Sequence, residues 1–206
     1  ALFGTNAAVN ARIGAMRGYD LIILQYGLNV MSADVLHYGS YEKAFIKVIN
    51  YMKRCFPNSS ILVMGVCDRS TQRDGEFVTM PAVRGMIEAQ RNAARETGVA
   101  FWNTFEAMGG ENSMVELVRK NWAAKDYTHL GYAGGKFIAG KLVGNWMQGV
   151  EAEQQRRDRI EEERRKNEML HYNRNDTIPG TIETETETDS DADAETTFTT
   201  NEFTQP

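Results

Sequence analysis

The sequence predicts a three-layer α/β protein, in which helices cover both faces of a parallel β-sheet. Three observations lead to this class. Continuous apolar runs, LIIL at 21–24 and ILVMGV at 61–66, are typical of strands that are buried on both faces. Helical patterns alternate with these strands along the chain. The length of 206 residues suits one domain of ordinary size.

The expected elements alternate between helix and strand, and only three strands are evident. A doubly wound sheet usually has more strands, which suggests that an N-terminal part is missing. The expected ranges are a helix at 5–17, a strand at 20–26, a helix at 41–56, a strand at 61–66, a helix at 81–96, a strand at 99–102, a short helix at 113–120 and a helix at 132–147.

Residue spacing and end signals support the helices. In the helix at 41–56, apolar residues recur three and four positions apart on one face. These residues are Ala44, Phe45, Val48, Ile49, Met52 and Cys55. Ser40 is placed to cap this helix, and Pro57 ends it. Pro81 opens the next helix, and Gly98 stops it.

Charge and apolar content argue against two kinds of partner. Residues 176–206 hold nine acidic side chains and no Lys or Arg, and removing these nine charges from the net charge of −5 leaves +4 for residues 1–175. This mild, scattered charge gives no electrostatic case for nucleic acid. No run of about 18 apolar residues exists, so we expect no membrane span. No signal peptide is visible, and because the chain begins with Ala1 we interpret it as a fragment or a processed product.

The two cysteines, Cys55 and Cys67, are expected to be unpaired thiols. Cys55 ends a helix and Cys67 ends the following strand of roughly 20 Å, so they should lie at opposite ends of the sheet. A disulfide requires Cα atoms within about 7 Å of each other. No CxxC spacing is present, so we expect no zinc site, and the sequence indicates no cofactor.

The C-terminal part differs in composition from the rest of the chain. From Glu151 to Asn175, seven Lys or Arg residues alternate with seven Asp or Glu residues, which predicts a solvated, fraying helix without a coiled-coil seam. The following residues are acidic and Thr-rich, as in disordered tails. We therefore expect a domain at 1–149, a charged helix at 150–175 and a disordered tail at 176–206.

Three polar residues that follow strands are candidates for chemistry. Asp126 and His129 are three residues apart, so a carboxylate can orient an imidazole and stabilise its protonated form. Alternatively, Asp126 caps a turn and His129 is a buried, hydrogen-bonded residue. Asn29 follows the first strand, and its amide can donate to a developing oxyanion, a contact worth about 2.7–4 kcal/mol. Alternatively, Asn29 only stabilises the turn.

Position favours a site over separate structural roles. The carboxyl ends of parallel strands share one edge of the sheet, where ligands bind, so these three residues should lie together. Asp68 and Arg69 follow the second strand on the same edge and begin a polar loop that extends to Thr79. They either form a salt-bridged loop or contact substrate, because the Arg fork suits a carboxylate or a sugar-linked anion.

Residues 19–146 resemble the later part of the SGNH, or GDSL-type, esterase and acylhydrolase family. Residues 27–29 match the family's Gly-x-Asn block, although Val30 stands where Asp usually follows. Asp126-x-x-His129 matches the final block. The segments DLIILQYGLNV, ILVMGVCDRS, GVAFWN and KDYTHLGYAGGK are similar to envelope members of this family from Bacteroides-like bacteria.

The resemblance implies a flavodoxin-like three-layer fold and a serine nucleophile in a Gly-Asp-Ser block. It implies that His129 is the general base and then the acid, that Asp126 orients it, and that Asn29 holds the oxyanion. None of the seven serines follows Gly-Asp, and Ser70 is the nearest imitation. We therefore expect the attacking hydroxyl to lie outside this chain and the fragment alone to be inactive.

The resemblance implies that the intact protein is a serine ester hydrolase. The expected substrate is a small acyl ester or an O-acylated glycan, with O-acetyl groups of an envelope glycan as the first candidate, and the expected location is the periplasm or cell envelope. Two alternatives remain: an O-acyltransferase that passes the acyl group to a sugar hydroxyl, and a non-catalytic glycan-binding or scaffold protein. The missing Gly-Asp-Ser block and Val30 favour the scaffold, whereas the Asp126–His129 couple favours an enzyme. Nothing in the sequence indicates the acyl length or the oligomeric state.

Overall fold

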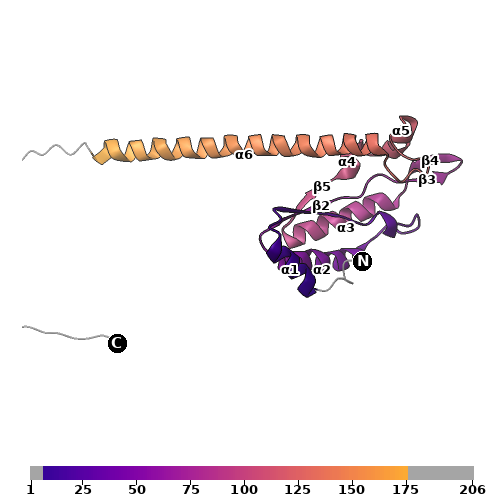
Figure 1. Ribbon diagram of the computed structural model, residues 1–206. Helices are drawn as coiled ribbons and strands as arrows, with labels where there is room; N and C mark the ends of the chain where they lie inside the picture. The colour runs from indigo at the N-terminus through magenta and orange to yellow at the C-terminus, as the bar shows by residue number, and fades with distance from the viewer. Residues whose placement is uncertain (1–6, 176–206) are drawn as a thin grey trace, which may run out of the picture. The chain divides into compact units, whose positions relative to one another are not determined.

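The structure, a computed structural model, describes residues 7–175 (Figure 1). Our expectations for residues 1–6 and for the tail at 176–206 lie outside this range. Contacts divide the chain into two units, Ala1–Gln154 and Gln155–Pro206. The first unit carries the sheet and its covering helices, and it is described first.

The main sheet has three parallel strands, which confirms the predicted fold class. The strands are β1 (Leu21–Gln25), β2 (Ser60–Met64) and β5 (Ala100–Trp102), in the order β1-β2-β5. Gln25 is the register partner of Met64, and Met64 is the partner of Trp102. The three strands therefore end at the same level, and the segments that follow them start from one edge.

Helices lie on both faces of this sheet (Figure 1). One layer contains α1 (Ala7–Met16), α2 (Gly39–Cys55) and α3 (Ala82–Thr97). The other contains α4 (Thr104–Met108), α5 (Ser113–Arg119) and the first part of α6 (Tyr132–Asn175). Ile49 of α2 and Val63 of β2 are fully buried between the first layer and the sheet. On the opposite side, Met114 of α5 is buried against Ile138 of α6.

The strand at 20–26 was expected to be buried on both faces, and this expectation is wrong. Leu24 is buried against the first helical layer, but Ile23, on the other face, is 45% exposed. β1 lies at the edge of the described sheet, and the helices of the second layer leave this face of it partly uncovered. On that other face, α6 reaches β5 instead, where the indole N–H of Trp102 donates to Asn145 Oδ1 at 3.2 Å.

The helix boundaries agree with the sequence signals except at one cap. α2 begins at Gly39, so Ser40 lies in its first turn, and the cap position is Tyr38, without a side-chain cap hydrogen bond. The prediction that Ser40 caps this helix is therefore wrong. α3 begins directly after Pro81 and ends at Gly98, which adopts φ 66° and donates its N–H to Ala94 O and Arg95 O.

The expected polar loop between Asp68 and Thr79 instead contains a β-hairpin. The strands β3 (Ser70–Arg73) and β4 (Glu76–Thr79) pair antiparallel. Asp74 and Gly75 between them have φ values of 52° and 86°. Positive φ at both central residues matches a type I′ turn, for which Asp-Gly is a preferred pair. This dipeptide was the available signal for the hairpin.

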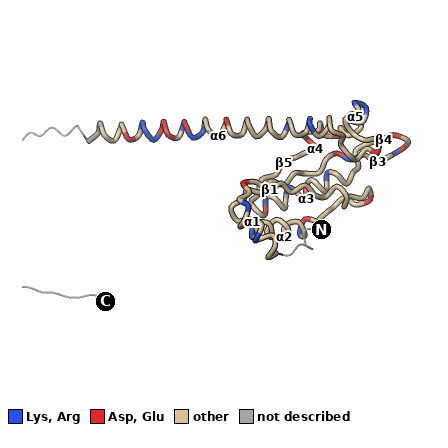
Figure 2. The backbone as a smooth tube through the Cα atoms, in the orientation of Figure 1, with Lys and Arg blue, Asp and Glu red and all other residues tan. Residues whose placement is uncertain are grey.

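A single helix, α6, replaces the two helices that were expected at 132–147 and 150–175. The charged part of α6 shows alternating blue and red segments in Figure 2. Within the second unit, Arg164 pairs with both Glu161 and Glu168, at 2.9 Å and 2.7 Å. Such pairs, three and four residues apart, support a helix that lacks a buried face. No helix among the described residues combines the length and the apolar character that a membrane crossing requires.

Gln90 of α3 is a fully buried polar residue that connects the ends of β1 and β2. Its Nε2 donates to the carbonyl of Tyr26 at 2.6 Å, and its Oε1 accepts from the N–H of Val66 at 2.9 Å. Tyr26 directly follows β1, and Val66 lies two residues after β2. One side chain therefore satisfies backbone groups of both segments where the strands stop pairing.

We expect Gln90→Leu to lower the free energy of unfolding by about 2 kcal/mol or more. Leucine would leave the carbonyl of Tyr26 and the N–H of Val66 without their protein partner, and each unsatisfied buried group costs about 1–3 kcal/mol. Urea unfolding followed by circular dichroism measures the change. Glu88→Leu, at an exposed position of the same helix, is the matched control. Equal losses in the two variants would contradict the role of Gln90.

Candidate active site

The turn after β1 depends on Gly27. This residue has φ 107°, a left-handed conformation that favours glycine. A Cβ atom here would lie 3.0 Å from Gln90 Nε2 and 3.1 Å from Met86 Sδ, so the turn is also tightly packed. The chain then forms the short 3₁₀ helix η2 (Leu28–Val30), which contains Asn29.

Asn29 is exposed, and its side-chain amide forms no hydrogen bond to any described residue. The turn itself is closed by the N–H of Val30, which donates to the carbonyl of Gly27 at 2.9 Å. The described contacts therefore give the Asn29 side chain no turn-stabilising bond, and its N–H groups are available to a ligand.

Asp126 makes two kinds of contact at once. Its Oδ1 accepts from the backbone N–H groups of Thr128 and His129, at 3.0 Å and 3.1 Å. Its Oδ2 lies 2.7 Å from Nδ1 of His129. The carboxylate thus caps the turn and also holds the imidazole, so the two interpretations of Asp126 are compatible. The side chain of His129 is 66% exposed, which differs from the buried alternative.

The pKa of Asp126 is lowered to about 2, first by the side-chain hydrogen bond of His129 and then by the two backbone N–H groups. Asp126 is therefore an anion at neutral pH. An anion accepts the Nδ1 proton, which leaves Nε2 of a neutral His129 with its lone pair free. This is the tautomer that a general base requires.

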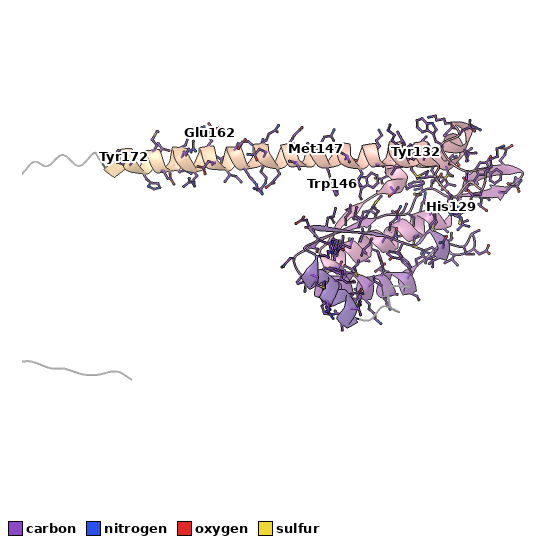
Figure 3. The ribbon with its side chains drawn as sticks, in the orientation of Figure 1. His129, Tyr132, Trp146, Met147, Glu162 and Tyr172 are labelled. Atoms are coloured by element: carbon purple, nitrogen blue, oxygen red, sulfur yellow. The ribbon has the colours of Figure 1, made fainter. Side chains whose placement is uncertain are left out.

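One pocket brings Asn29 and His129 together. It has a volume of about 470 Å³. Its lining residues are Gln25, Tyr26, Gly27, Leu28, Asn29, Val30, Val66, Cys67 and His129. Figure 3 labels His129, which lies just before α6 begins at Tyr132. The structure therefore brings two of the predicted site residues to the same cavity, with Asp126 behind the imidazole.

Asp68 is not brought to this pocket. Its side chain is completely buried, and its Oδ2 accepts from the N–H of Met114 at 2.8 Å and from Ser113 Oγ at 3.4 Å. Burial raises the pKa of this carboxyl group, and its hydrogen bonds oppose that effect. The geometry gives Asp68 a structural contact with the start of α5, and it does not support the expected contact with substrate.

Arg69 lies next to the site and contacts backbone. Its Nη1 donates to the carbonyl of Leu28 at 3.1 Å, beside Asn29. The next residue, Ser70, donates its N–H to the carbonyl of Tyr127 at 3.0 Å. Residues 69 and 70 therefore link the Asn29 turn to the Asp126–His129 loop through backbone contacts. A contact of Arg69 with substrate stays a prediction.

Cys67 is the lining residue whose side chain could be mistaken for a nucleophile. Burial, followed by the charge of Asp68, raises the pKa of its thiol to about 11. The reactive form of cysteine is the thiolate, so Cys67 stays an inert thiol at neutral pH. Cys55 and Cys67 are both buried, and neither forms a disulfide within the described residues, as predicted.

The sequence reasoning missed Gln90, and its position offered a signal. It lies one turn after Met86 and Ile87 on the apolar face of α3. A long amide at a core position requires buried hydrogen-bond partners.

Within residues 7–175, no group of three His, Cys, Asp or Glu side chains comes together that could hold a metal ion.

Comparisons with known proteins support the fold. No protein-family model matches the sequence, and no curated protein matches it. Among solved structures, the chain is similar to a peptidoglycan O-acetylesterase, with a TM-score of 0.60 and 24% identity. That similarity covers 70% of this chain and 41% of the esterase chain, so this chain spans less than half of its length.

Two further crystal structures are more distant. One has a TM-score of 0.52 at 14% identity and covers 66% of this chain and 68% of its own. The other, described as a GDSL-like lipase from Parabacteroides merdae ATCC 43184, has a TM-score of 0.47 at 14% identity and covers 67% and 66%. The last similarity is too low to carry an argument. The similarity to the esterase confirms the predicted α/β fold class, in which helices cover a parallel sheet.

We expect His129→Ala to raise the pKa of Asp126 above about 2 while leaving it below the ordinary aspartate value. The largest cause of the lowered pKa is the imidazole, but the N–H groups of residues 128 and 129 remain in the variant. The measurement is the carboxyl ¹³C shift of Asp126 during an acid titration. His37→Ala, at an exposed histidine outside the site, is the matched control and should change nothing.

Proposed function

We propose that the intact protein is a serine ester hydrolase of the SGNH type and that this chain supplies its base and one oxyanion donor. The observation that carries the proposal is the shared pocket of Asn29 and His129. Asp126 lies 2.7 Å from the far nitrogen of that imidazole. Base, orienting acid and donor are the parts that acyl transfer needs beside a hydroxyl nucleophile.

The chemistry follows from these positions. Nε2 of His129 takes the proton of the serine hydroxyl while the serine oxygen attacks the carbon of the ester carbonyl. The carbonyl oxygen becomes an oxyanion, to which the Asn29 amide donates. His129 then protonates the departing alcohol oxygen, and an acyl-enzyme remains. Water repeats the sequence on the acyl-enzyme, releasing the acid and restoring the serine.

The nucleophile, in this proposal, comes from residues outside the 206 of this chain. No Gly-Asp-Ser block is present, and no serine is among the residues that line the pocket. β1 is an edge strand of the described sheet, so a further strand can pair beside it. The end of such a strand would lie next to Asn29, within the edge where His129 also lies.

The proposed substrate is an acyl ester, with an O-acetyl group of an envelope glycan as the first candidate. The similarity to a peptidoglycan O-acetylesterase supports this choice. That substrate class would place the intact protein in the periplasm or the cell envelope. Transfer of the acyl group to a sugar hydroxyl uses the same residues, and product analysis with a glycan acceptor separates an O-acyltransferase from a hydrolase.

We expect the purified 206-residue chain to show no turnover of p-nitrophenyl acetate above the rate of its His129→Ala variant. A base without an adjacent hydroxyl nucleophile forms no acyl-enzyme by this route. Release of p-nitrophenolate, followed by absorbance, measures the rate. A version extended to include a Gly-Asp-Ser segment should gain turnover that His129→Ala removes.

The controls separate the proposal from its alternatives. His37→Ala should leave any turnover of the extended protein unchanged. Turnover by the 206-residue chain that His129→Ala abolishes would contradict the external nucleophile. An extended protein that binds the acylated glycan but neither hydrolyses nor transfers its acyl group would favour the scaffold alternative, which the absence of Gly-Asp-Ser and the presence of Val30 support.

A further inference from the structure

The β3–β4 hairpin contacts the loop that carries the candidate base. Within the described residues its two strands pair only with each other, and a lone hairpin is marginally stable in water. The ring of Phe77 on β4 stacks on the ring of Tyr127, with centroids 3.7 Å apart and planes 9° apart. Tyr127 directly follows Asp126 and lies two residues before His129. The hairpin therefore reaches the candidate site through this pair of rings.

Tyr127 adopts an unfavourable backbone conformation. Its φ is 53°, in the left-handed region that bulky residues rarely occupy. The backbone of Tyr127 forms two hydrogen bonds. Its N–H donates to the carbonyl of Ala124 at 3.1 Å, and its carbonyl accepts from the N–H of Ser70 at 3.0 Å. Because Asp126 and His129 lie on either side, the backbone at Tyr127 sets how the carboxylate and imidazole approach each other.

The hairpin is anchored at the end away from its turn. Thr79 donates its N–H to Asn112 Oδ1 at 3.0 Å, and Asn112 returns its own N–H to Thr79 Oγ1 at 2.7 Å. Met80 donates its N–H to the carbonyl of Arg69 at 2.7 Å. These hydrogen bonds fix the strand that carries Phe77, and Phe77 itself is 37% exposed.

We propose that Phe77 is a positioning residue, which stacks on Tyr127 to hold the loop in the conformation that joins Asp126 to His129. The inference rests on the proposed function only in giving His129 a chemical task. A ring that merely covered surface would leave the Asp126–His129 contact unchanged when removed. A ring that served as a platform for a sugar would do the same in the absence of ligand.

The test measures the tautomer of His129 in the full 206-residue chain, with ¹⁵N–¹H long-range correlation spectra near pH 9, where imidazoles are neutral. In the unchanged protein, Asp126 should hold the proton on Nδ1, so one tautomer is expected. Phe77→Ala should convert this single tautomer into a mixture. Phe77→Tyr, which keeps the stacked ring, should preserve it. Thr71→Ala, on the other face of the hairpin, is the matched control.

None of these substitutions changes a charge, so the charged neighbours Arg73, Asp74 and Glu76 of the hairpin and Lys125 of the loop stay as they are. A single Nδ1–H tautomer that persists in Phe77→Ala, with unchanged amide signals for β1 and β2, would overturn the proposal. If Phe77→Ala loses its fold, Phe77→Leu keeps apolar volume without the aromatic stack and gives the same readout.

A second variant tests the backbone part of the inference. Glycine accepts positive φ without strain, so Tyr127→Gly should keep the loop conformation without the stack. In that background, Phe77→Ala should cause no further loss of the single tautomer, and independent losses would contradict the proposal. Because no turnover is measured, failure of the proposed esterase activity would leave this result unaffected.

Discussion

One buried amide, Gln90, connects the two segments on which the pocket depends. Its contacts with Tyr26 and Val66 hold the ends of β1 and β2 together where their ladder stops. Gly27 packs against the same side chain, so the turn that presents Asn29 takes its position from the core of α3. The turn that carries Asn29, the first half of the candidate site, is therefore held in place by a buried polar residue of α3. This explains how an exposed amide can keep a defined place on a loop.

The second half of the site, the Asp126–His129 loop, is supported by the segment after β2 and by the β3–β4 hairpin. The Asp126–His129 loop accepts a hydrogen bond from Ser70, and Tyr127 in this loop stacks on a ring of the hairpin. Within the loop, Asp126 accepts a hydrogen bond from the backbone of Thr128. Ser70 and Arg69 are adjacent, and they contact the two halves separately. The segment after β2 is thus a common support, and the two halves cannot shift independently without breaking one of these backbone contacts.

Local pattern was enough for the parallel sheet, the main helices and the shared edge of Asn29 and His129, because apolar runs and helix-ending residues are properties of short segments. Local pattern was insufficient wherever the burial or the contacts of a residue depend on another residue far along the chain. Asp68 looked like an edge residue, but the backbone of Met114 takes its carboxylate into the interior. Ile23 looked like core, but the described residues leave it 45% exposed. The roles of Gln90 and Phe77 depend on contacts 64 and 50 positions away in sequence, which no window of neighbouring residues contains.

The outer edge of β1 has a consequence for handling the protein. Its backbone N–H and C=O groups have no strand partner within residues 7–175, and Ile23 adds an apolar surface beside them. An uncovered edge of this kind is a template for another extended chain, and neighbouring molecules in a concentrated solution are the nearest source of one. The 206-residue chain should therefore be prepared dilute and kept cold, since precipitation and fibrous self-association start from such edges.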